Sequence, residues 1–308
     1  MISFFEPTQL YLKALWTYWS AVCGISDVQP AYISYQTLRS TQSSVLVQIG
    51  LLAKDTKEVI IFSGVGSLRI AFNKAFSEVL EAQLAQEMNV PSDEGRSGFA
   101  CARSLAEAQI NAYSELIERD AFVQHFIIPT LASQRLPIVT IENEVIEAAE
   151  LQSPDPHIKV VMAAIRRGDS RVLGLGNAAT VQDALTRAVN ESLMLAISFT
   201  PSISANQPRK ALFSRHYEAS ASPEISARLD QILAGKGREL SKFCTSIQDS
   251  HIKAQRQFCK SRIAIKVEHD SLLPLTFGNR WIESQSRLKE IVTSRGLDPQ
   301  EIPLHPIL

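Results

Sequence analysis

The chain has 308 residues, of which 45% are hydrophobic and 20% charged, as in ordinary soluble globular proteins. At about 150 residues per domain, this length predicts one large domain or two ordinary ones. Thirty-one Lys and Arg against 32 Asp and Glu give a net charge of -1, which argues against a nucleic-acid-binding surface. No apolar run approaches the roughly 18 residues that span a bilayer, and no secretory signal is recognised. We therefore expect a cytoplasmic protein without nucleic-acid or membrane partners.

The predicted elements mix helices and strands along the whole chain. An aromatic-rich helix is expected over residues 10–22 and could support a homodimer. Apolar β-rich runs at 45–52, 59–63, 159–166 and 262–268 alternate with helical segments. A further helical stretch, 224–247, has proline-rich flanks and is expected to be a peripheral insertion. The pattern indicates an α/β or α+β fold with a mixed sheet.

Three helical segments repeat one another without gaps. Residues 67–82, 104–119 and 180–195 stack so that two alanine positions and one glutamate position coincide. The coinciding residues are Ala71, Ala108 and Ala184; Ala75, Ala112 and Ala188; and Glu78, Glu115 and Glu191. Ser67, Ser104 and Thr180 fall at the helix starts, where their hydroxyls could cap backbone N–H groups. Alanines four residues apart lie on one helix face and permit close packing.

Glycines precede each of these helices, at 64–66, 95–98 and 174–176. The third group also begins a G-x-G-x-x-A pattern, a weak match to a dinucleotide-binding turn. No acidic residue follows a second strand as that fold requires. We therefore expect the glycines to serve tight turns or a close approach of two backbones.

Acidic residues gather late in the repeated helices. Glu78 with Glu81, and Glu115 with Glu118, are spaced three apart, and Glu191 occupies the third repeat. Like charges at that spacing face each other on a helix and are mildly unfavourable unless a cation compensates. Converging helices would concentrate carboxylates that suit Mg²⁺ with phosphate oxygens as co-ligands. The alternative is that each glutamate is a solvated residue on a helix surface.

The segment S-G-F-A-C-A from Ser97, followed by E-L-I-E-R-D-A from Glu115, resembles a signature of the YcaO-domain family. Residues 64–81 and 173–191 are similar to two further motifs of that family, and 273–278 and 302–306 to its C-terminal segments. The resemblance implies a YcaO-like fold of repeated strand, glycine-turn and helix units around an acidic ATP and Mg²⁺ site. It further implies a single domain, 1–308, comprising 1–60 (helix and strands), 61–200 (motif repeats), 209–256 (helical insertion) and 257–308 (C-terminal segment).

By this resemblance, members use ATP and Mg²⁺ to activate a backbone amide of a ribosomally made peptide. Cyclodehydratases among them convert Cys, Ser or Thr to thiazolines or oxazolines in natural-product (bacteriocin-type) biosynthesis, and others form thioamides or amidines. Carried over residue by residue, the ATP-binding positions are Glu78, Glu115, Glu118, Arg119 and Glu191, and the metal positions are Glu78, Glu81, Glu115 and Glu118. No catalytic base is assigned, since His125 and His305 are more typical of packed or surface imidazoles. A precursor peptide and a separate leader-peptide-binding protein are the expected partners.

Several positions depart from the family pattern. Lys74 stands where a small polar residue is common, Ala82 where an Arg follows the first motif, and Met194 and Ala196 where a Gln and an Arg follow the third. The connection 82–93 is short, and the C-terminal tail has only two of the usual spaced prolines. Two hypotheses therefore stay open: an active peptide-modifying enzyme, which we favour, or a noncatalytic YcaO-like scaffold of a biosynthetic complex. A generic nucleotide-binding protein is a third.

Overall fold

The computed structural model describes most of the chain. The described residues are 6–38, 44–52, 59–90, 97–141, 144–168, 170–198, 222–235, 247–273 and 292–293. The predicted C-terminal motifs after residue 273, the proline-rich stretch 201–208 and His305 lie outside them. No helix in the described part is long and apolar enough to cross a membrane.

The N-terminal part forms a three-stranded antiparallel sheet with a helix on it. Its elements are α1 Glu6–Val22, β1 Pro30–Leu38, β2 Ser44–Leu52, β3 Val59–Gly66 and α2 Leu68–Glu87, with the strands in the order β1-β2-β3. α2 buries Phe72 and Phe76 against this sheet. Trp16 of α1 meets Phe76 edge-on, with 5.5 Å between ring centroids, so the aromatic N-terminal helix joins the same core. The outer face of α1 still exposes Leu10 and Tyr18, and the homodimer stays a prediction.

A second antiparallel sheet lies between α2 and the next helix. Its elements are β4 Phe99–Ala102, α3 Leu105–Ile127, β10 His251–Cys259 and β11 Arg262–Glu268, with the strands in the order β10-β11-β4. Alternate residues of β4 face opposite sides, as strand geometry requires. Phe99 and Cys101 join the core under α2, whereas Ala100 and Ala102 join the core under α3.

The third sheet lies between α3 and α4. Its elements are β5 Ser133–Arg135, β6 Val139–Ile141, β7 Glu144–Leu151, β8 Lys159–Arg167, β9 Ser170–Ala178 and α4 Val181–Ser198, followed by α7 Pro223–Leu233 and the 3-10 turn Ile247–Asp249. The strand order is β5-β7-β8-β9, with β6 beside β7, and every pair is antiparallel. Met162 faces the core shared with α3, and Val161 faces the core shared with α4. The expected combination of helices and sheets is confirmed as an α+β fold with antiparallel pairing in its described sheets.

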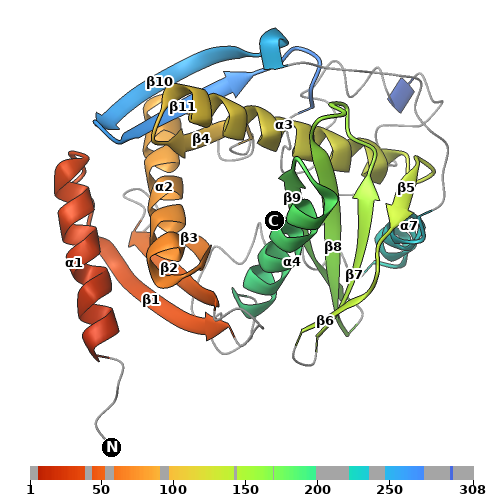
Figure 1. Ribbon diagram of the computed structural model, residues 1–308, viewed down its shortest axis with the longest axis horizontal. Coiled ribbons are helices and arrows are strands. Elements are labelled where there is room, and N and C mark those ends of the chain that lie inside the picture. Colours follow the sequence, from red (N-terminus) through yellow and green to blue (C-terminus); the bar gives the residue numbers. More distant parts are fainter. Residues whose placement is uncertain are drawn as a thin grey trace, which may run out of the picture.

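Sheets and repeat helices thus alternate around the middle of the molecule (Figure 1). α4 also reaches back to the first sheet, where Met194 and Ile197 pack on Leu46 and Val65. This contact closes the succession of layers into a ring: first sheet, α2, second sheet, α3, third sheet, α4. The middle turns of the three repeat helices carry Glu78, Glu115 and Glu191, whose charges all act on Arg119.

The glycines before the helices allow strands and helices to touch through their backbones. Gly64 and Gly66 end β3, and Gly174 and Gly176 lie within β9, so these residues belong to strands and not to turns. A Cβ atom added at Gly64 would lie 2.1 Å from the carbonyl oxygen of Ala71. Of the two expected reasons for glycine, close approach of two backbones is confirmed at these positions, and the tight turns are not found there.

The predicted helix caps form at two of the three sites. The hydroxyl of Ser104 accepts the N–H of Glu107 at 3.2 Å, and that of Thr180 accepts the N–H of Asp183 at 3.2 Å. Ser67 makes no side-chain cap, so that prediction is wrong. In the proposed insertion 209–256, the described residues form α7, but residues 251–256 belong to β10.

Candidate active site

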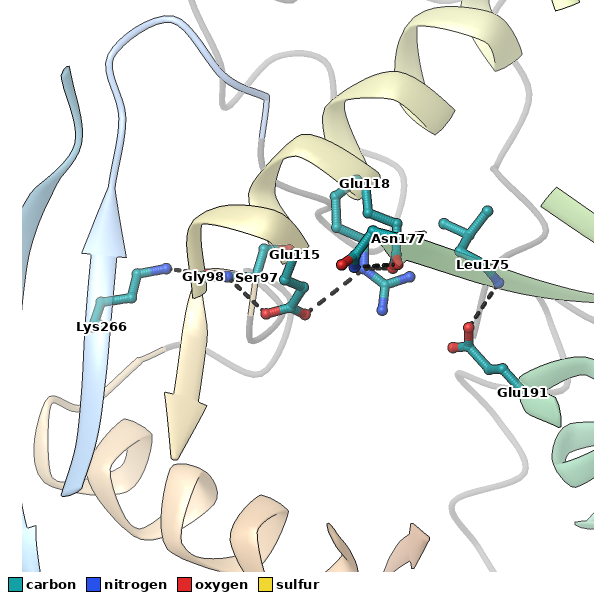
Figure 2. Close-up of polar contacts among 9 residues, drawn as sticks. Ser97, Gly98, Glu115, Glu118, Leu175, Asn177, Glu191 and Lys266 are labelled. Carbon is teal, nitrogen blue, oxygen red and sulfur yellow. Dashed lines mark hydrogen bonds and ion pairs between the residues drawn. The ribbon is translucent and has the colours of Figure 1, made fainter. Parts of the chain in front are cut away.

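Three carboxylates from α3 and α4 lie around Arg119. Glu115 and Glu118 are on one face of α3, and Glu191 lies on α4 across the region from them (Figure 2). The helix geometry explains the first pair, because residues three apart point to the same side. Glu191, the third carboxylate, comes close because α4 closes the ring of layers.

Glu115 bridges the start of β4 and Arg119. One carboxylate oxygen accepts the N–H of Gly98 at 3.0 Å, and the other lies 3.8 Å from Nε of Arg119. Gly98 has a φ of +75°, which a glycine adopts without strain. Lys266 of β11 bonds the carbonyl of Ser97 next to it, and its charge acts on Glu115. Burial raises the pKa of Glu115 to about 7 despite the neighbouring Arg119.

Glu118 is the most buried of the three carboxylates, with 7% of its side chain exposed. It accepts a hydrogen bond of 2.7 Å from the side-chain amide of Asn177, at the end of β9. Burial raises its pKa, while Arg119, Asn177 and Arg187 oppose the rise. The main-chain carbonyl oxygen of Asn177 in turn accepts a hydrogen bond of 2.8 Å from Nη1 of Arg187.

Arg119 supplies the central positive charge. Its Nε lies 3.8 Å from oxygens of both Glu115 and Glu118. Burial disfavours the charge, but Glu118, Glu191, Glu115 and Glu78 outweigh that effect and raise the pKa of Arg119. Its Nη1 is buried and has no hydrogen-bond partner among the residues that the structure describes. Such a group is costly unless something binds it.

Glu191 accepts the N–H of Leu175 in β9 at 2.7 Å (Figure 2). Burial raises its pKa to about 8, with Arg119 opposing and the charges of Glu118 and Glu78 adding to the rise. The carboxyl is thus protonated at neutral pH until a cation replaces its proton.

Glu78 and Glu81, the acidic pair of α2, have different surroundings. Glu81 accepts the N–H of Cys101 at 2.8 Å and so ties α2 to β4. Glu78 acts electrostatically on Arg119, Glu191 and Lys74, which places it with the central group. The structure therefore joins Glu78, Glu115, Glu118, Arg119 and Glu191 in one region, with Glu81 beside β4.

These residues fit ATP with Mg²⁺. Burial raises the pKa values of Glu115 and Glu191, and a bound cation would offset the cost of ionising these carboxyls. The unpartnered Nη1 of Arg119 is a directed donor of the kind that phosphates accept. Within the described ranges, no three His, Cys, Asp or Glu side chains form a ready metal-binding group, and the assigned metal ligands stay predictions. Mg²⁺ commonly binds proteins through one or two carboxylates together with phosphates and water.

Sequence reasoning missed Asn177, Arg187 and Lys266. Asn177 directly follows the G-L-G of β9, and this position was the available signal. Lys266 comes from a strand far along the chain, and nothing local connects it to Glu115. His125 is buried, its Nδ1 donates to the carbonyl of Ala121 at 2.7 Å and its Nε2 accepts the N–H of Gln152 at 3.2 Å. Burial lowers its pKa, so its position agrees with a structural role.

Comparisons with known proteins show which family this chain and its fold resemble. A family model described as "YcaO cyclodehydratase, ATP- and Mg²⁺-binding" matches residues 88–263, more than half of the chain. The chain is similar in structure to YcaO from Methanopyrus kandleri bound with AMPPCP and Mg²⁺, with a TM-score of 0.55 and 15% identity over 85% of this chain and 90% of that chain. It also aligns with the heterocyclase TruD, with a TM-score of 0.36 and 15% identity over 69% of this chain and 34% of that chain. No curated protein matches.

The matched range contains Glu115, Glu118, Arg119 and Glu191 and begins after α2. The fold likeness extends further and takes in most of both chains. The family's described cofactors, ATP and Mg²⁺, agree with the chemistry of the carboxylates and of Arg119. This chain belongs to the YcaO family.

Proposed function

We propose that this protein is an active, ATP- and Mg²⁺-dependent enzyme that modifies the backbone amide of a ribosomally made peptide, with azoline formation from Cys, Ser or Thr as the reaction. Family membership supports the general chemistry. The observation that carries the proposal is the set of buried carboxylates with raised pKa values around the unpartnered Nη1 of Arg119.

The proposed roles follow from the contacts. Glu78, Glu115, Glu118 and Glu191 would hold Mg²⁺ and phosphate, with Glu81 as a further metal position. ATP supplies the phosphoryl group that makes an amide oxygen a good leaving group, and Mg²⁺ offsets the charge. Arg119 binds phosphate oxygens through Nη1 while its Nε stays beside Glu115 and Glu118.

Backbone N–H groups orient these carboxylates before any ligand arrives. Gly98 fixes one oxygen of Glu115, and Leu175 fixes one oxygen of Glu191. In Glu115 the other oxygen lies beside Arg119, 3.8 Å from its Nε, so one oxygen faces β4 and the other faces the central charge. This division lowers the entropic cost of ordering the site on binding.

The proposal includes the partners expected from the family resemblance. The substrate is a ribosomal precursor peptide, delivered by a separate leader-peptide-binding protein in the cytoplasm. The homodimer is likewise part of the proposal.

A specific observation favours a second candidate, the noncatalytic scaffold. Met194 and Ala82 pack against hydrophobic cores, and Ala196 is buried. These apolar side chains occupy positions where the family resemblance implies a Gln and two Arg. They contribute packing where directed phosphate donors would otherwise stand.

Mg·ATP binding and turnover distinguish the two candidates. We expect calorimetry to show metal-dependent ATP binding by the purified protein, and Glu115→Ala and Glu118→Ala to abolish turnover. Glu268→Gln is the control, because Glu268 lies on β11 in an exposed ion pair with Lys253. Unchanged turnover in both site variants would refute the enzyme, and a wild-type protein that binds no Mg·ATP would favour the scaffold.

A further inference from the structure

Two free cysteines from distant parts of the chain lie side by side. Cys23 directly follows the last residue of α1, and Cys259 ends β10 at the hairpin turn into β11. The tip of this hairpin lies beside the C-terminal end of α1 (Figure 1), and the thiol of Cys23 donates to Sγ of Cys259 at 3.5 Å. The two residues are 236 positions apart in the sequence, so only the fold brings their sulfurs together.

The end of α1 fixes the backbone of Cys23. The N–H of Gly24 donates to the carbonyl of Ala21 at 3.2 Å, and that of Ile25 donates to the carbonyl of Ser20 at 2.8 Å. Gly24 has a φ of +68°, so the three residues form a Schellman-type helix end with Cys23 as its last helical position. The thiol therefore projects from a defined cap.

Arg262 holds the hairpin against the helices. It pairs with Cys259 across the hairpin, and its guanidinium lies 5.1 Å from the ring centroid of Trp19 in α1. Its Nη2 also donates to the side chain of Asn73 in α2 at 3.2 Å. Packing on both sides thus keeps the two sulfurs adjacent.

The two thiols differ in exposure and in acidity. Cys259 is half-buried, and although burial raises its pKa, the N–H and hydroxyl of Ser261, the thiol of Cys23 and the charge of Arg262 outweigh that effect and lower it. Cys23 is 2% exposed, and burial, together with the hydrogen bond to Cys259 and its charge, raises the pKa of Cys23 to about 12. Since the thiolate is the reactive form, Cys259 is the nucleophile and Cys23 is a thiol held next to it.

This pair suits oxidation better than metal binding. Within the ranges that the structure describes, no third His, Cys, Asp or Glu joins the two sulfurs in a metal-binding group, whereas a structural zinc site needs four ligands. An accessible, acidic cysteine beside a second cysteine is the arrangement of peroxide-sensitive thiols. We propose that Cys23 and Cys259 form a reversible disulfide between α1 and the β10–β11 hairpin when hydrogen peroxide is present. The inference is independent of the proposed nucleotide site.

The reaction takes two steps. The thiolate of Cys259 attacks one oxygen of hydrogen peroxide, the O–O bond breaks, hydroxide leaves, and Cys259 becomes a sulfenic acid. Its charge then no longer raises the pKa of Cys23. The sulfur of Cys23 attacks the sulfenic sulfur, the S–O bond breaks, and the oxygen leaves as water with the proton of Cys23. The two sulfurs lose two electrons in all, and the peroxide gains them.

The disulfide would tie α1 covalently to the second sheet. An approach of about 1.5 Å takes the sulfurs from 3.5 Å to the bonding distance of about 2.0 Å. The bond would close a very long loop of the unfolded chain, and such loops gain most from a crosslink. We expect the melting temperature to rise by about 3 to 10 °C on oxidation and to return on treatment with dithiothreitol.

Peptide mapping after treatment with hydrogen peroxide tests the pair directly. Trypsin places the four cysteines of the chain on separate peptides, 14–39, 97–103, 243–253 and 257–260. We expect peptide 14–39 to be joined to 257–260, with loss of two hydrogens from the intact protein, and dithiothreitol to reverse both changes. A bond from Cys259 to Cys101 or Cys244 in its place, or no loss of free thiols, would overturn the inference.

Single variants assign the roles. In Cys23→Ala, peroxide should leave a sulfenic acid on Cys259 that dimedone captures, whereas Cys259→Ala should consume peroxide about tenfold more slowly or less. Cys101→Ala is the matched control, because Cys101 is also a buried thiol, 9% exposed, in the core that contains Cys23. It should retain both the linked peptides and the shift in melting temperature. Absence of a dimedone adduct at Cys259 in Cys23→Ala would contradict the assignment of Cys259 as the nucleophile.

Discussion

Replacing Glu191 by Gln should stabilise the unliganded protein while it weakens Mg·ATP binding. The pKa of Glu191 rises from an ordinary 4.5 to about 8 in the folded protein. Between these values the folded state holds a proton that the unfolded state has released. This carboxyl therefore lowers the free energy of unfolding progressively as pH rises, and the full loss is reached above pH 8. A glutamine remains neutral at every pH and keeps an oxygen that can accept the N–H of Leu175.

The expected gain follows from the size of the pKa shift. Each pKa unit corresponds to about 1.4 kcal/mol, and from pH 4.5 to pH 7 the upper limit is about 3 kcal/mol. Glu191 interacts with Glu118, Glu78 and Arg119 and keeps partial contact with solvent, so part of the shift is shared. We expect the variant to be about 1 to 3 kcal/mol more stable at pH 7, and less than about 1 kcal/mol more stable at pH 5.

Urea unfolding at pH 5, 7 and 8 without nucleotide or metal measures this difference. Wild-type stability relative to the variant should fall steadily across that range. Calorimetry on the same preparations should show Mg·ATP binding weakened about tenfold or more, because an amide is a poorer ligand for Mg²⁺ than a carboxylate. A stability difference independent of pH, or a less stable variant at pH 8, would refute the assignment of a raised pKa to Glu191.

Three further outcomes are expected. Gly176→Ala should lower the free energy of unfolding by about 1 to 3 kcal/mol, measured by urea unfolding, because its Cβ would meet backbone atoms of α4 at 2.2 and 2.5 Å. Asp120→Ala should cost about 1 to 3 kcal/mol and speed amide hydrogen exchange at Leu273, whose N–H donates to the Asp120 carboxylate at 2.9 Å. Mg·ATP affinity should rise between pH 6 and 8, with proton release in calorimetry, because the cation displaces protons from Glu115 and Glu191, whose pKa values are about 7 and 8.

A control variant or a contradicting result can be named for each of these three predictions. Gly168→Asn should be tolerated far better than Gly176→Ala, because nothing lies within 4 Å of its Cβ position and Asn accepts its φ of +61°. An Asp120→Ala protein as stable as wild type would show that the bond to Leu273 is dispensable. Affinity that does not change with pH would contradict proton displacement from the carboxyls.

Local features of the sequence predicted the repeat helices and the helix faces that pack. Alanines four residues apart and glycines two apart follow directly from helix and strand periods, and Ala71 and Ala184 are both fully buried. Because helices hold fixed side-chain directions, the register that aligned Glu78 with Glu191 also identified two members of the site. The helices continue beyond the predicted segments, to 23 residues in α3, since nothing breaks the apolar pattern there.

Long-range pairing was not predictable from one sequence. β4 pairs with β11, more than 150 residues later in the chain, and this pairing brings Lys266 near Glu115. The sequence left both tight turns and close backbone approach open for the glycines, because it does not show that a helix backbone lies against the strand. The role of Asn177 likewise depends on α3 crossing the end of β9.

The contact between α4 and the first sheet closes the ring of layers. It consists of a small apolar cluster from Leu46, Val65, Met194 and Ile197, whereas the other layers share extensive cores. With so small an apolar core, this contact is the part of the ring that we expect to open at the lowest free-energy cost.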